Sequence, residues 1–113
     1  MLISEVIQLA RDLWREKAEN DIFDSAQCIR FINQAIIRIR SRRNDSLVDD
    51  NGNFRDYVAI TATTDTFPLD VRFSMSAAKF LVAYGFSAIA DLENKKAVSE
   101  YWMQQFEAEL AAA

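Results

Sequence analysis

The sequence predicts a mostly α-helical fold: a four-helix bundle-like domain with a small β-hairpin between the second and third helices. Three observations support this. The 113 residues fit one domain, spanning residues 1–113. Hydrophobic residues make up 50%, while Gly and Pro, the residues that break helices, occur only twice and once. Apolar residues also recur at three- and four-residue spacing over long stretches, which is typical of amphipathic helices.

The first two helices are expected at residues 4–18 and 24–43. Ser4 can cap the first, with Glu5 in its first turn. In the second, Asp24 and Gln27 form a variant of the capping box. Ile37 falls on the face opposite the apolar stripe, which is a first indication of a contact beyond the monomer. That stripe consists of Cys28, Ile32, Ala35, Ile36 and Ile39.

The hairpin is expected in the segment that follows the second helix. Residues 44–56 form a polar loop with an Asn51-Gly52 turn. Residues 57–61 are rich in aromatic and β-branched side chains, which favours a strand. The chain can turn at 63–65 and return at 66–67, ahead of Pro68. Since two isolated strands are only marginally stable, such a hairpin must lie on the helices or on a neighbouring subunit.

The last two helices are expected at residues 71–92, after Asp70, and at 95–110. The third is apolar almost all round, so it lies either at the centre of the domain or in an oligomer interface. The fourth has an apolar stripe at four-residue spacing, and Tyr101 lies off that stripe. The side chains expected to form the core are Trp14, Phe23, Ile32, Ile36, Phe80, Tyr84, Trp102 and Phe106.

Charge is distributed unevenly along a chain of net charge −4. Residues 24–43 carry five basic groups and one acidic group, whereas residues 44–70 carry one basic and six acidic groups. The arginines Arg38, Arg40, Arg42 and Arg43 fan around the end of the second helix. Three interpretations stay open: helix capping with pairing to Asp45, Asp49 and Asp50, a contact with another subunit or a portal, and nucleic-acid binding.

The residue inventory argues against catalysis and metal binding. The chain has no His and a single Cys, which leaves neither a His base nor a Cys/His zinc site. Aligning Gly52 with the glycine of a calcium loop puts Leu47 and Val58 where carboxylates are needed. We therefore expect no enzyme, no cofactor and no metal. The longest uncharged apolar stretch, residues 80–90, is too short to cross a bilayer, and no signal peptide is visible.

The stretch from Ile22 to Ala35 resembles the second helix of the head–tail adaptor (connector) proteins of tailed bacteriophages. The family often shows an aromatic residue, a Ser/Thr-Asp-type cap, and then aromatic–aliphatic–Asn–x–Ala, here Phe31-Ile32-Asn33-Gln34-Ala35. Phe23 stands where Trp is common, and the Arg-Pro-Asp type ending lacks its proline at 42–45. Phe67-Pro68-Leu69 resembles the family's hairpin exit, and Ala97, Tyr101 and Phe106 fit its last helix. The similarity covers about residues 20–110.

The resemblance implies a structural virion protein that forms a ring, commonly of twelve subunits, beneath the portal. Such a ring extends the DNA channel without sequence-specific binding and gives tail or neck components an attachment surface. It implies a place in the virion neck, after assembly in the host cytoplasm. The alternative is a small helical nucleic-acid-binding regulator that uses 38–43, although the pI of 4.8 weighs against it. The expected subunit or portal interface comprises Ile37, Arg38, Arg40, Arg42, Arg43, Asp45, Asp49, Asp50 and Tyr101.

Overall fold

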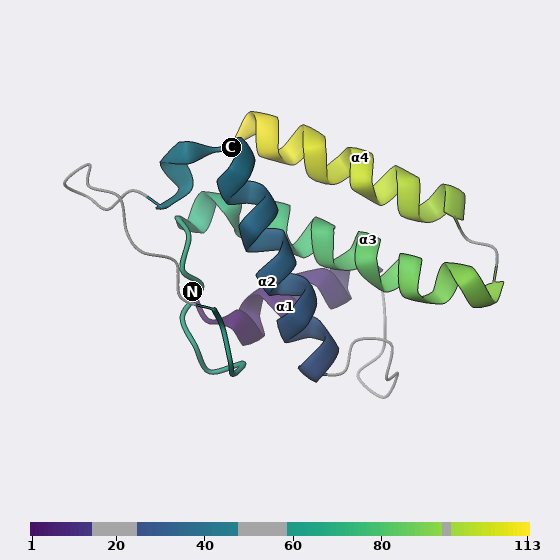
Figure 1. Ribbon diagram of the computed structural model, residues 1–113, viewed down its shortest axis with the longest axis horizontal. Helices are drawn as coiled ribbons and strands as arrows, with labels where there is room; N and C mark the ends of the chain where they lie inside the picture. The colour runs from purple at the N-terminus through teal and green to yellow at the C-terminus, as the bar shows by residue number, and fades with distance from the viewer. Residues whose placement is uncertain (15–24, 48–58, 94–95) are drawn as a thin grey trace.

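A computed structural model describes residues 1–14, 25–47, 59–93 and 96–113 of the chain. This part is mostly helical, as predicted (Figure 1). The helices are α1 (Ile3–Trp14), α2 (Ser25–Arg42), α3 (Ser74–Glu93) and α4 (Lys96–Ala112), and two 3₁₀ turns are η2 (Asn44–Leu47) and η3 (Val71–Phe73). Within these residues, no helix is long and apolar enough to cross a membrane.

Helix α3 is the central element of the fold. The other three helices all pack on it, and α4 runs back along it in the opposite direction (Figure 1). Its described first half is buried nearly all round, including Ala77, Phe80 and Leu81. Of the two expectations for this apolar helix, a central position therefore holds for residues 74–84. The side chains of 85–93 lie outside the described part.

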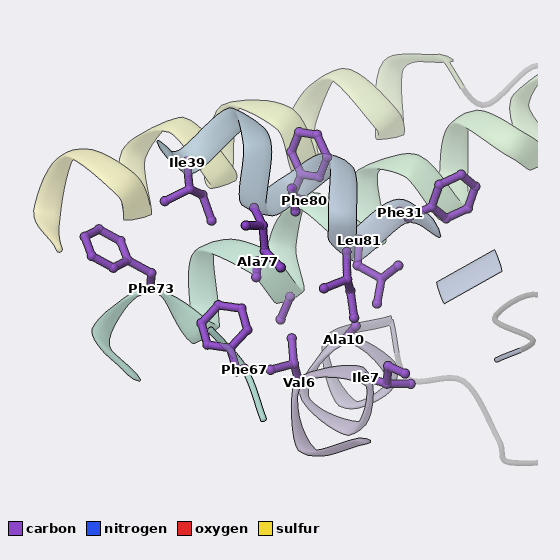
Figure 2. Packing of buried hydrophobic residues seen from close by; sticks show 14 of the residues in the cluster. Val6, Ile7, Ala10, Phe31, Ile39, Phe67, Phe73, Ala77, Phe80 and Leu81 are labelled. Atoms are coloured by element: carbon purple, nitrogen blue, oxygen red, sulfur yellow. The ribbon is translucent and has the colours of Figure 1, made fainter. Parts of the chain in front are cut away.

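One hydrophobic core joins the four helices and the segment before α3. Val6 and Ala10 of α1 point toward Leu81, and Phe67 packs beside Val6 (Figure 2). The predicted core residues Ile32, Ile36, Phe80 and Phe106 are almost fully buried, and Tyr84 and Trp102 are partly buried against this cluster. Phe23 and the side chain of Trp14 lie outside the described residues.

The predicted β-hairpin is not seen in the described residues, and 57 and 58 of its first strand fall outside them. The backbone of Ile60 bonds instead to a side chain of α2: its N–H donates to Asn33 Oδ1 at 2.9 Å, and its C=O accepts from Asn33 Nδ2 at 3.0 Å. The expected return strand pairs with the N-terminal segment, because Thr66 forms an isolated antiparallel bridge with Leu2. The backbone groups of the described parts of both expected strands are thus bonded to other segments of the chain.

Helix α1 begins one residue earlier than predicted, and Ser4 is not its cap. The backbone N–H groups of Ile3 and Ser4 donate to the carbonyls of Asp65 and Thr63, at 2.9 and 3.0 Å. The Glu5 carboxylate accepts from the N–H of Leu2. The first two free N–H groups of the helix start are therefore satisfied by the 63–65 loop, a tertiary contact that local sequence signals do not reveal.

Candidate interface around the ends of α2 and α4

Arg43, which follows α2, joins four elements of the fold. Its Nε and Nη2 atoms donate to the two carboxylate oxygens of Asp45 at 3.1 and 3.0 Å. Its Nη1 donates to the main-chain carbonyls of Leu110 and Ala113 at 2.8 and 2.7 Å. The guanidinium also lies 5.2 Å from the ring centroid of Phe73. Arg43 therefore satisfies carbonyls at the C-terminal end of α4, which that helix cannot satisfy itself.

Asp45 is shared between two arginines. Arg72 Nη2 lies 2.5 Å from Asp45 Oδ2. The Arg72 guanidinium also lies 4.8 Å from the ring centroid of Phe73, the ring that Arg43 contacts. The hydrogen bonds from Arg43 lower the pKa of the Asp45 carboxyl and raise the pKa of the Arg43 guanidinium. Pairing between Arg43 and Asp45, one of the interpretations left open by the sequence, is thus confirmed.

Arg38 and Arg42 pair with a residue that the sequence analysis missed. Both lie on the side of α2 that meets α4. Arg38 Nη2 is 3.8 Å from Glu107 Oε1, and Arg42 Nη1 donates to Glu107 Oε2. One feature of the sequence could have indicated this pairing: α2 contains basic but no acidic residues, whereas α4 contains several acidic residues. Arg40 is exposed on α2, and Asp49 and Asp50 lie outside the described residues.

Ion pairs within the chain reduce the capacity of the basic segment 38–43 to bind phosphates. Arg38, Arg42 and Arg43 each have a carboxylate of the same chain within ion-pair distance. A phosphate would have to compete with these carboxylates, which weakens non-specific nucleic-acid binding. The geometry is that of a cluster that joins α2 to α4.

Ile37 and Tyr101 are the predicted interface residues with large exposed apolar side chains. Each is 53% exposed, Ile37 on α2 and Tyr101 on α4. Arg38 is one residue from Ile37 and faces α4, so Ile37 is turned about 100° away from that contact. The sequence correctly placed both side chains outside the core.

A surface hollow of about 300 Å³ lies beside Ile37, between α2 and α3. Its α3 wall belongs to a run of aromatic rings that crosses three helices. Ring centroids are 5.4 Å apart for Phe31 and Tyr84, 4.5 Å for Phe80 and Tyr84, and 4.9 Å for Phe80 and Phe106. The lining residues are Gln34, Ile37, Arg38, Ser41, Phe80 and Tyr84.

No cluster of three or more metal-ligating side chains occurs among the residues that the structure describes. Comparisons of the chain with models of known protein families, with curated proteins and with solved structures find no match.

Proposed function

We propose that this chain is a ring-forming head–tail adaptor of a tailed bacteriophage. In this role it docks beneath the portal, extends the DNA channel and offers an attachment surface to tail or neck components. It acts as a structural protein without catalysis or a cofactor, in the virion neck after assembly in the host cytoplasm. A ring of twelve copies and a β-hairpin completed by residues outside the described part also belong to this proposal.

The observation that carries the proposal is a pair of exposed, largely apolar side chains on different helices. Ile37 and Tyr101 expose more than half of their surface on α2 and α4, outside the contacts that hold the two helices together. A subunit that contacts neighbours on two sides needs two different surfaces, and a repeated contact of this kind closes into a ring when its rotation allows. The helical architecture and the resemblance of residues 22–35 support the same function.

Asn33 gives that resemblance a physical basis in this chain. The residue occupies the Asn position of the aromatic–aliphatic–Asn–x–Ala pattern and binds both backbone polar groups of Ile60. It thereby fixes the segment before α3 against α2. An Asn at this position therefore serves the architecture that the resemblance implies.

The second candidate, a nucleic-acid-binding regulator, draws on the arginine segment 38–43. Arg38, Arg42 and Arg43 already have carboxylate partners in the chain, and the net charge of −4 opposes approach to phosphates. We therefore prefer the adaptor hypothesis. A titration of the chain with short duplex DNA distinguishes the two functions, because the regulator requires tight binding that weakens steeply with salt.

Co-sedimentation with portal rings tests the proposal. Portal rings of the same phage are mixed with the wild-type chain and separated on a density gradient. We expect the chain to travel with the portal and Ile37→Glu to reduce the bound amount at least tenfold. The matched control is Gln8→Glu, which places the same charge on the exposed face of α1. Failure of the wild-type chain to travel with the portal would contradict the proposal.

A further inference from the structure

The hollow beside Ile37 is shallow and open, and its mixed apolar and polar lining suits one aromatic side chain laid against it. Its volume of about 300 Å³ lies at the small end of ligand sites in proteins. Tyr84 supplies aromatic surface above the buried Phe80, and Ile37 supplies an aliphatic wall. Gln34, Arg38 and Ser41 place polar groups around the apolar part. Such a site suits a ring that carries one polar atom.

One donor at the hollow has no acceptor. The Nε atom of Arg38 is buried and forms no hydrogen bond with the residues that the structure describes, although Nη2 of the same side chain reaches Glu107. A buried donor without a partner costs free energy. Because Nε is shielded from solvent, an oxygen atom that enters the hollow would remove this cost once the Arg38 side chain shifts to expose Nε.

The chain itself carries a side chain that fits. Tyr101 is 53% exposed and packs edge-on against Trp102, with ring centroids 5.5 Å apart, so its orientation is partly fixed. Glu107 marks the side of α4 that meets Arg38, and Tyr101 lies about 120° around the helix from Glu107. Tyr101 is therefore directed away from the hollow of its own chain.

We propose that Tyr101 of one copy inserts into the hollow beside Ile37 of the next copy. Its ring packs against Ile37 and Tyr84, and its phenolic oxygen accepts a hydrogen bond from the Arg38 guanidinium, which shifts toward the hollow to expose Nε. Tyrosine suits this role because it brings a large contact area at a small cost in side-chain entropy. The inference rests on the proposed ring and specifies which two surfaces form it.

Charge favours the same approach. Glu100 precedes Tyr101 and is exposed, and it belongs to none of the ion pairs found in the described part of the chain. Of the two helices that line the hollow, α2 carries only basic charged residues, of which Arg38 and Arg42 already pair with Glu107. Since the inserting and receiving surfaces differ, the contact is heterologous, and it propagates into a closed ring or a filament.

Cross-linking between two marked chains tests the insertion. One chain carries Gln34→Cys at the rim of the hollow, and the other carries Gln104→Cys, one turn beyond Tyr101 on the exposed face of α4. The native Cys28 is fully buried and is kept. The chains are mixed, alone at high concentration and with portal rings, and treated with a short bismaleimide. We expect cross-linked pairs of the two different chains.

Variants of the inserted residue make the result specific. Adding Tyr101→Ala to the Gln104→Cys chain should lower the cross-linked yield at least tenfold. Tyr101→Phe, which keeps the ring and removes the oxygen, should lower it less. A Thr64→Cys chain, marked on an exposed loop, should not cross-link in place of Gln34→Cys. Circular dichroism checks that each variant is folded.

The remaining outcomes separate this inference from the proposed function. If the chain assembles on the portal and the cross-linked yield does not depend on Tyr101, the insertion is wrong while the adaptor proposal stands. Pairs of two Gln34→Cys chains would show a symmetric α2–α2 contact, which also overturns the insertion. A chain that neither self-associates nor binds the portal contradicts both.

Discussion

The side-chain amide of Asn33 on α2 holds both backbone polar groups of Ile60. It accepts from the N–H at 2.9 Å and donates to the C=O at 3.0 Å, in the manner of a neighbouring strand. Ile60 is buried, so water cannot easily replace these bonds. The segment before α3 therefore lies against α2 through a single polar side chain rather than through a sheet.

Removing this amide should destabilise the fold. Asn33→Ala leaves a buried donor and a buried acceptor unpaired, which costs about 1–3 kcal/mol for each group. Asn33→Asp keeps the acceptor but turns a carboxylate toward the Ile60 carbonyl, so it should not restore stability. Urea unfolding measures both variants. The exposed neighbour Gln34→Ala is the control, with an expected change within about 0.5 kcal/mol. Equal stability of Asn33→Ala and the wild type would refute this role.

Two adjacent isoleucines of α2 should respond very differently to truncation. Ile36 is fully buried, whereas Ile37 is 53% exposed. Ile36→Ala should lower the free energy of unfolding by about 2–5 kcal/mol through lost burial and the cavity left behind. Ile37→Ala should change it by no more than about 0.5 kcal/mol. Thermal unfolding of the two variants measures the contrast, and similar losses would contradict the assigned faces of α2.

Arg43 should be irreplaceable by lysine. Its guanidinium bonds to both oxygens of Asp45 and to the carbonyls of Leu110 and Ala113, and one ammonium group cannot meet all four acceptors. Arg43→Lys should therefore accelerate hydrogen exchange of backbone amides in the last turn of α4. The neighbouring Arg42→Lys is the control, because an ammonium can keep the single pairing to Glu107. Equal exchange in the two variants would be inconsistent with capping by Arg43.

Low pH should weaken the pairing between Arg43 and Asp45. Hydrogen bonds from Arg43 hold the pKa of Asp45 below its ordinary value. The unfolded chain thus takes up a proton first as pH falls, so the stabilisation is complete above about pH 4–5 and is lost as pH falls through the folded-state pKa. Asp45→Asn should flatten the fall of Tm with acid below about pH 5. An unchanged slope would exclude a contribution from this pair.

A second carboxylate should add to the acid dependence independently. The pKa of Asp65 is lowered mainly because the backbone N–H groups of Thr61 and Ala62 donate to its carboxylate. Asp65 lies in a different part of the chain from Asp45 and shares no partner with it. Each of Asp45→Asn and Asp65→Asn should reduce the slope of Tm against pH below about pH 5, and these reductions should add in the double variant. A non-additive result would indicate that the two turns unfold as one unit.

Periodic patterns predicted the helices and most of the core because burial follows a local rule. The spacing that placed Ile32 and Ile36 in the core also placed Ile37 outside it. The ends of the helices were less predictable. Helix α1 begins on carbonyls of the 63–65 loop, and such a partner cannot be identified from the residues around Ser4.

The charged contacts show the same limit. The pair Arg43–Asp45 was within reach of sequence reasoning because the two residues are neighbours in the chain. Glu107 lies far from Arg38 and Arg42 in sequence, so only the folded structure, in which these long side chains reach from α2 to α4, identifies it as their partner. The predicted hairpin is not seen in the described residues for a related reason: Asn33 and Leu2, rather than another strand, bond to its two halves.

Electron microscopy of the chain mixed with portal rings tests the central claim most directly. Because a single contact must offset the entropy of association alone, the portal is expected to act as a template that brings neighbours together. We expect class averages with a closed ring of this chain stacked on one face of the portal, and the ring should be lost with Ile37→Glu. Portal rings that remain bare at saturating concentrations of the folded wild-type chain would contradict it.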